Sequence, residues 1–227
     1  MEWAIDLCEH LRAFNKSLAH PLEFSTNLRV IPNKDFDSLF SAFEKSGFTF
    51  VNIGVESGSD RVRKEVLKRN YANSDIVNAV RSARKHNLRV CFFNLIGLPE
   101  ETEDDFKETI EINRMCQPDW YYLSIFYPYP GTELYAHCVQ KGLIRKPLNP
   151  TMERSRVVID SPCFESDAVQ KQFQWFDYNI YRGYKPLYKI LARVMVTKIK
   201  SNPYLNFLYR RITQGGILGY IKNKLRR

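Results

Sequence analysis

The sequence predicts an α/β protein: a partial barrel of parallel strands and crossover helices, followed by a basic helical extension at the C-terminus. Helical and strand signals alternate along residues 1–144, which is typical of parallel strands joined by helices. Asp177 is the last acidic residue, so residues 178–227 hold 12 Lys and Arg and no Asp or Glu. The net charge of +9 therefore belongs to the tail, because residues 1–177 contain 22 basic and 25 acidic residues.

The first part of the chain predicts two pairs of helix and strand. The chain opens on apolar residues at helical spacing, and Leu22–Val30 has the composition of a first strand. Asn33 is expected to cap the next helix, and Gly47 to end it, because glycine readily adopts the left-handed conformation found after helices. Phe48–Val55 is the second expected strand.

The same alternation continues in the second part. Ser59 is placed to begin a short helix, and Ser74 to cap a longer one that leads to a third strand at Leu88–Ile96. Thr102 followed by Asp105 resembles a capping box, which predicts another helix after that strand.

A fourth strand, a last helix and a linker follow. The strand is expected at Trp120–Tyr127 and the helix at Thr132–Lys141. Residues 145–162 contain three prolines and few apolar residues, which indicates a linker. We therefore expect a barrel part at residues 1–144, this linker, and a helical basic tail at residues 163–227.

The five cysteines show no spacing that is typical of a metal site. They lie at least 22 positions apart: Cys8, Cys91, Cys116, Cys138 and Cys163. We expect reduced, mostly buried thiols and no metal ligands within this chain. No window reaches the ~20 apolar residues of a membrane-spanning helix and no signal peptide is visible, which predicts a cytoplasmic protein.

The carboxyl ends of the expected strands form the candidate site, because reactive groups in parallel α/β folds gather there. Glu56 directly follows an apolar strand, where its carboxylate could accept two hydrogen bonds from the vicinal hydroxyls of a ribose. Gly54 lies just before it, and Gly58 could let a ligand approach the backbone. The alternative for Glu56 is a carboxylate that stabilises a helix N-terminus.

A second glycine marks the end of the third strand. Gly97 would let a flat ring such as adenine lie against the main chain, with Leu95 and Ile96 as apolar contacts. The alternative is that Gly97-Leu98-Pro99 forms an ordinary turn.

Four segments, in order, resemble the radical S-adenosylmethionine (SAM) superfamily, in particular its branch with a cobalamin-binding domain. Val51–Ser59 is similar to the ribose motif of that superfamily. Phe93–Glu100 is similar to its GxIxGxxE motif, with Phe93 in place of glycine and Leu95 in place of isoleucine. Asn27-Leu28-Arg29 resembles an Asn-x-Arg motif, and Pro128–Leu134 resembles Pro-x-Pro-Gly-Thr-x-Leu.

The resemblance implies a SAM site in which Glu56 binds the ribose, Gly97 and its neighbours the adenine, and a polar or basic side chain the methionine end. The residues expected to bind SAM are Gly54, Glu56, Gly58, Leu95, Ile96, Gly97, Asn27, Arg29 and Lys68. No catalytic residue is assigned.

The resemblance also implies a 4Fe-4S cluster and, in this branch, cobalamin. The CxxxCxxC motif that holds such a cluster is absent from the sequence, and four strands are too few to close a barrel. We therefore expect both the motif and further strands before Met1, and an isolated chain that is inactive. The complete enzyme would form a 5′-deoxyadenosyl radical for methyl transfer or related C–H chemistry on a small-molecule or lipid-like substrate. The alternatives are a non-catalytic nucleotide-binding module and a non-radical SAM-dependent methyltransferase.

The tail has apolar and aromatic residues at helical spacing between basic ones, in three segments at 180–195, 205–212 and 217–221. Such helices could pack on the barrel with solvated basic faces. They could also bind an anionic membrane surface, through residues 178–227, or nucleic acid without sequence specificity. We favour the membrane over nucleic acid.

Overall fold

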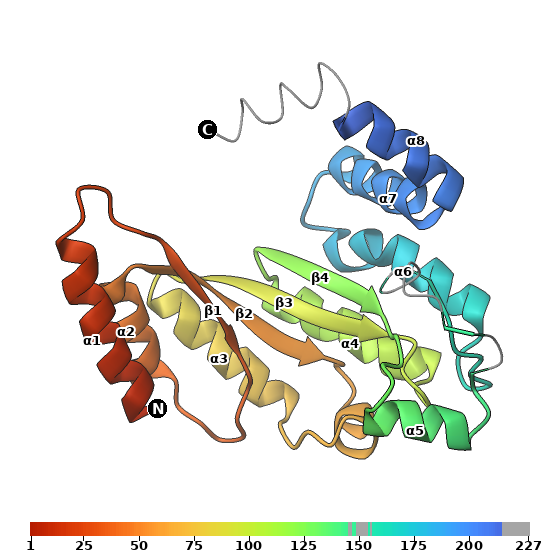
Figure 1. Ribbon diagram of the computed structural model, residues 1–227, viewed down its shortest axis with the longest axis horizontal. Helices are drawn as coiled ribbons and strands as arrows, with labels where there is room; N and C mark the ends of the chain where they lie inside the picture. Colours follow the sequence, from red (N-terminus) through yellow and green to blue (C-terminus); the bar gives the residue numbers. More distant parts are fainter. Residues whose placement is uncertain (145–146, 149–153, 155, 215–227) are drawn as a thin grey trace. The chain divides into compact units, whose positions relative to one another are not determined.

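The computed structural model describes residues 1–144, 147–148, 154 and 156–214. The chain forms two compact units, Met1–Val169 and Gln170–Arg227, and the division falls within helix α6 (Ser166–Tyr181). Figure 1 shows the elements of each unit.

The first unit is built on a parallel sheet with the order β1-β2-β3-β4, and every neighbouring pair of strands is parallel. Its elements are α1 (Glu2–Lys16), β1 (Phe24–Leu28), α2 (Asp37–Ser46), β2 (Phe48–Glu56), a π-helix (Val62–Val66), α3 (Asn73–Lys85), β3 (Arg89–Ile96), α4 (Glu103–Cys116), β4 (Trp120–Ile125) and α5 (Glu133–Gln140). The predicted α/β class is thereby confirmed, and the strands follow the predicted sequence order.

The two faces of the sheet have different partners because side chains alternate along a strand. Val51, Ile53 and Val55 of β2 are fully buried in an apolar cluster with residues of α2 and α3, which lie on one face of the sheet (Figure 1). The alternate positions, Asn52 and Gly54 among them, face the other way and are only partly buried. This second face carries the candidate site.

Two helix caps were predicted correctly. Gly47 ends α2 with a φ of +98°. Thr102 begins α4, where its side chain accepts a hydrogen bond from the Asp105 N–H and the Asp105 carboxylate accepts one from the Thr102 N–H.

Two other predicted caps are wrong. The N-cap of α2 is Phe36, while Asn33 lies in a left-handed turn and donates its N–H to the Asp75 carboxylate. The N-cap of α3 is Ala72 instead of Ser74, and the same Asp75 carboxylate accepts the Ala72 N–H at 2.8 Å. Asp75 thus caps α3, whereas at the start of α2 the Asp35 carboxylate accepts the Asp37 N–H at 2.9 Å.

The second unit continues α6 with α7 (Leu187–Ser201) and α8 (Pro203–Gln214). The helix predicted over residues 180–195 is not continuous. It is interrupted between α6 and α7, where Gly183 has a φ of +94° and Pro186 is the N-cap of α7. The predicted segment at 217–221 lies outside the described residues, as do several residues of the expected linker. Within the described part of the chain, no helix is long and apolar enough to cross a membrane.

Candidate active site

Glu56 ends β2 in an unusual backbone conformation. Its φ is +59°, in the left-handed region, and the register between β2 and β3 shifts between Gly54 and Glu56. A left-handed conformation at a residue other than glycine costs about 1–2 kcal/mol, and such strain is concentrated at functional sites. The irregularity sets the direction of the Glu56 side chain at the strand end.

The Glu56 carboxylate is largely buried and has one ionic partner. Its side chain is 20% exposed, and its Oε1 lies 3.4 Å from Nη1 of Arg69. Burial raises the pKa of Glu56 above its ordinary value, and the charge of Arg69 partly opposes that rise. A Cβ at position 54 would lie 2.9 Å from Oε1 of Glu56, so any larger residue there would require the Glu56 carboxylate to shift.

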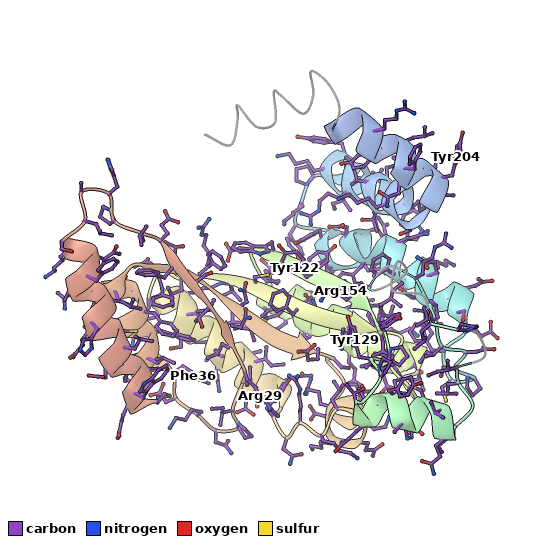
Figure 2. All side chains as sticks on the ribbon, viewed as in Figure 1. Arg29, Phe36, Tyr122, Tyr129, Arg154 and Tyr204 are labelled. Atoms are coloured by element: carbon purple, nitrogen blue, oxygen red, sulfur yellow. The ribbon has the colours of Figure 1, made fainter. Side chains whose placement is uncertain are left out.

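Glu56 lines a cavity of about 440 Å³ on the open face of the sheet. A cavity of this size is typical of small-molecule sites. Its other lining residues are mostly apolar and aromatic: Phe93, Asn94, Leu95, Tyr122, Ser124, Ile125, Phe126, Tyr127, Tyr129 and Arg154. Tyr122 on β4, Tyr129 just beyond it and Arg154 are labelled in Figure 2.

Leu95, which was expected to contact adenine, lines this cavity, whereas Ile96 and Gly97 do not. Ile96 is fully buried, and Gly97, with a φ of +76°, packs against Val169, which a Cβ there would approach to 3.1 Å. The Gly97 turn is held from within by Glu101, whose Oε2 accepts the N–H groups of Gly97 and Leu98 at 2.6 and 3.1 Å.

Glu101 is a residue that sequence reasoning missed. It is fully buried, and burial raises its pKa to about 8, although its hydrogen bonds with the backbone oppose that rise. Its Oε1 has no hydrogen-bond partner within the described structure. A glutamate so close to the more exposed Glu100 gives no sequence signal of burial.

The three residues expected at the methionine end do not line the Glu56 cavity. Asn27 and Arg29 are exposed at the end of β1, where the Asn27 Oδ1 accepts a hydrogen bond from the Asn52 side chain at 2.9 Å. Lys68 donates to the Glu65 carbonyl oxygen at 2.7 Å and lines a second cavity, of about 450 Å³, which Arg69 also lines. Arg69 is therefore the basic residue that reaches Glu56.

Gly58, which was expected to let a ligand approach the backbone, lies against a helix and away from the cavity. It is buried beneath α4 and donates its N–H to the Thr109 hydroxyl at 2.8 Å. A Cβ at this position would lie 2.3 Å from the Glu108 carbonyl oxygen. The missing side chain therefore allows the loop after β2 to approach a helix, and Gly58 is not among the residues that line the cavity.

We expect Gly58→Ala to lower the free energy of unfolding by about 1–3 kcal/mol, because the added methyl group meets helix backbone that cannot move without repacking. Urea denaturation would measure the loss. Gly131→Ala is the matched control for the steric effect, since nothing lies within 4 Å of a Cβ there, although its φ of +86° adds backbone strain. A smaller loss at Gly58 than at Gly131 would contradict the close approach to α4.

A buried arginine holds the loop that follows Glu56. Arg63 is fully buried, and its guanidinium donates to the Ser57 carbonyl at 2.6 Å and to the Tyr71 carbonyl at 3.1 Å, and pairs with Asp60. The Tyr71 hydroxyl in turn donates to the Gly54 and Val55 carbonyl oxygens. These contacts fix the end of β2 from both sides of Glu56.

A second arginine joins this loop to the loop after β3. Arg61 pairs with Asp105 at 2.5 Å and donates to the Glu100 carbonyl oxygen at 2.8 Å. Burial alone would raise the pKa of Asp105, but hydrogen bonds from Arg61, Thr102 and Ser59 outweigh it and hold that pKa well below its usual range. Neither arginine could be identified from the sequence. Arg61 binds residues about 40 positions away, and the backbone partners of Arg63, although close in sequence, are brought to it only by the folded loop.

The cysteines lie apart from this cavity. Cys163 is exposed and the other four are buried. Burial raises the pKa of the Cys91 thiol to about 12 and those of Cys116 and Cys138 to about 11. Among the described residues, no group of three or more His, Cys, Asp or Glu side chains could hold a metal ion.

Residues 4–112 match the radical SAM superfamily. An uncharacterised methyltransferase of Pyrococcus horikoshii is 28% identical over 108 residues, which are 48% of this chain and 23% of that protein. A tRNA-2-methylthio-N(6)-dimethylallyladenosine synthase of Chromobacterium violaceum is 33% identical over 116 residues, 50% of this chain and 24% of that protein. The chain thus spans about a quarter of the length of these curated relatives.

Solved structures share the fold. Coproporphyrinogen III oxidase of Escherichia coli, a radical SAM enzyme, is 15% identical with a TM-score of 0.56 over 78% of this chain and 37% of its own. The cobalamin-dependent enzyme OxsB, with aqua-cobalamin bound, is 13% identical with a TM-score of 0.55 over 96% of this chain and 40% of its own. The methyltransferase TsrM of Kitasatospora setae, with cobalamin and a 4Fe-4S cluster bound, is 13% identical with a TM-score of 0.52 over 85% of this chain and 40% of its own.

The match covers the first three strands and the loops that carry Glu56 and Gly97, and the structural likeness extends over the whole sheet. The superfamily uses SAM together with a 4Fe-4S cluster. Through residues 4–112, the chain is similar to the radical SAM superfamily.

Proposed function

We propose that this chain forms the SAM-binding part of a radical SAM enzyme, with the Glu56 cavity as the site for the nucleoside of SAM. The observation that carries the proposal is the position of Glu56: a largely buried carboxylate, in a left-handed conformation at a strand end, on the wall of a cavity of about 440 Å³. An ionised carboxylate there can accept both hydroxyls of a ribose.

The surrounding residues support this role. Arg69 favours the ionised form of Glu56, which is the form that accepts hydrogen bonds from the two hydroxyls. Leu95 and the ring pair Tyr127–Tyr129, with centroids 5.1 Å apart, offer apolar contact for an adenine. The Arg61–Asp105 and Arg63 contacts hold the two loops in place before a ligand arrives.

The cysteines of this chain do not fit the cluster of the superfamily, because four are buried and the described residues contain no group that could hold a metal. When bound elsewhere in such enzymes, the cluster supplies the electron that cleaves SAM. We propose methyl transfer or related C–H chemistry on a small molecule for the whole protein, with cobalamin as a further cofactor. The methyltransferases among the relatives and solved structures support this reaction class.

Titration calorimetry of residues 1–227 with SAM and with S-adenosylhomocysteine tests the nucleoside site. We expect both to bind, and adenosine to compete, because the ribose and adenine contacts are independent of the cluster. A complete lack of binding by all three, in protein shown to be folded, would overturn the proposal.

A separate partner is suggested by the surface of the second unit. Large apolar side chains are exposed along both of its last helices: Leu187, Tyr188, Leu191 and Met195 on α7, and Tyr204, Leu205, Phe207 and Leu208 on α8. Figure 2 labels Tyr204. The sequence from residue 178 onward has basic and no acidic residues. Arg193 pairs with Asp177 at 2.7 Å, but the positive charges still outnumber the negative ones in this unit. Apolar side chains among positive charges favour an anionic membrane surface.

We expect the protein to bind vesicles that contain phosphatidylserine and to lose that binding as NaCl is raised, since each basic residue near an anionic surface contributes about 1 kcal/mol. Vesicle co-sedimentation measures this. Phe207→Ser should weaken binding, whereas Phe14→Ser, which alters a similarly exposed phenylalanine on α1, should not. Equal binding to neutral phosphatidylcholine vesicles, or binding to RNA in place of vesicles, would count against the membrane.

A further inference from the structure

The open face of the sheet is organised in rows that cross the strands. Asn52 of β2 is aligned with Cys91 of β3, and that residue with Trp120 of β4. The next row toward the strand ends contains Gly54, Phe93 and Tyr122, two residues further along each strand. Glu56 follows two residues after Gly54 on β2 and, because of the register shift, is opposite Asn94, the residue after Phe93. The row therefore lies deeper in the sheet than Glu56.

Two aromatic rings form the middle row. The centroids of Phe93 and Tyr122 are 5.3 Å apart with an angle of 31° between the rings, and both residues line the Glu56 cavity. Tyr122 is 57% exposed. On the β2 side the row has Gly54, which has no side chain to cover Phe93. The rings therefore form a platform that is open to a ligand, which we name the Phe93–Tyr122 platform.

Polar groups lie on both sides of this platform along the strands. Toward the strand ends is the Glu56 carboxylate. In the opposite direction is the amide of Asn52, which donates to Asn27 at 2.9 Å and retains its own side-chain oxygen as an acceptor. A molecule that rests on the platform would have a flat apolar surface beneath it and hydrogen-bonding groups at its edge.

We propose that the Phe93–Tyr122 platform is the substrate seat, and that it takes a planar, unsaturated ring with at least one polar edge. Stacking on aromatic side chains selects flat ligands, and each aromatic contact contributes modestly but directionally. The location, one row below the carboxylate assigned to the SAM ribose, places a stacked ring beside the nucleoside. The role of the platform as the substrate-binding site rests on the proposed SAM site. Binding of a planar ring to the platform does not depend on SAM.

Ligand-observed NMR with indole as the probe, and octahydroindole as its saturated counterpart, tests the seat in the 227-residue chain. We expect saturation transfer to indole and not to octahydroindole. Phe93→Leu and Tyr122→Leu should each weaken indole binding about 2- to 10-fold, which is the fold-change for one aromatic pair. Phe14→Leu, at an exposed position on α1, is the matched control and should leave binding unchanged.

Three results with indole alone would overturn the proposal: indole and octahydroindole binding alike, no binding of indole at all, or variants at the platform that bind indole as the wild-type protein does. Circular dichroism of each variant excludes unfolding as the cause of a loss. S-adenosylhomocysteine is titrated on the same samples. If it displaces indole, the platform is the adenine site instead of a separate seat, and the inference fails while the proposed SAM site stands. If indole binds and S-adenosylhomocysteine does not, the proposed function fails and the planar-ring site remains.

Discussion

Glu56→Ala is expected to weaken the binding of SAM by about 5- to 150-fold, which corresponds to about 1–3 kcal/mol for hydrogen-bonding groups that lose their partners. The loss is expected because the carboxylate is the acidic group that lines the cavity, and the two ribose hydroxyls would otherwise have to exchange water for an apolar wall. Titration calorimetry measures the change. Glu111→Ala removes an exposed carboxylate from α4 and should leave the affinity unchanged.

The pH dependence of binding separates this role from a purely structural one. Burial raises the pKa of Glu56 above its ordinary value of 4.5. The ionised form accepts both hydroxyls, so the affinity should fall as the pH is lowered through this raised pKa, and therefore at a higher pH than for an ordinary glutamate. Glu56→Gln should bind weakly and show no such fall. An unchanged affinity in both variants would remove Glu56 from the site.

Local signals in the sequence predicted most of the fold. The strands β2 and β3 are nearly continuous apolar runs, and Gly47 and Thr102 end and begin helices through contacts within a few residues. Glu56 could be placed for the same reason, because it follows directly on an apolar run. The expected caps Asn33 and Ser74 failed because the carboxylates of Asp35 and Asp75 accept the N–H groups at the starts of α2 and α3, and a single sequence does not show such competition.

The remainder of the site depends on contacts between residues far apart in the chain. Gly58 looked like a residue that admits a ligand, but it admits α4, about 50 positions later. Arg69 and Lys68 are neighbours with the same charge. The conformation of the folded backbone determines that the Arg69 side chain, and not that of Lys68, reaches Glu56. Periodicity and motif spacing do not contain this information, so the sequence alone could not show which of the two reaches Glu56.

Arg63→Met is expected to cause the largest loss of stability, about 2–5 kcal/mol in the free energy of unfolding. Its guanidinium is fully buried and donates to two backbone carbonyl groups, and each buried acceptor left without a donor costs about 1–3 kcal/mol. Arg63→Lys should recover only part of the loss, because an ammonium group cannot reproduce the planar set of donors.

The free energy of unfolding is measured by urea denaturation for Arg63→Met and for its control, Lys64→Met. Lys64 is the next residue of the same π-helix but is exposed, so its replacement should change the free energy of unfolding by no more than about 0.5 kcal/mol. Ser57, whose carbonyl Arg63 holds, directly follows Glu56. SAM binding should therefore weaken in Arg63→Met even at urea concentrations and temperatures where the variant is folded. Equal stability of the two variants would mean that the buried guanidinium does not hold this loop, and that the position of Glu56 is set by the sheet alone.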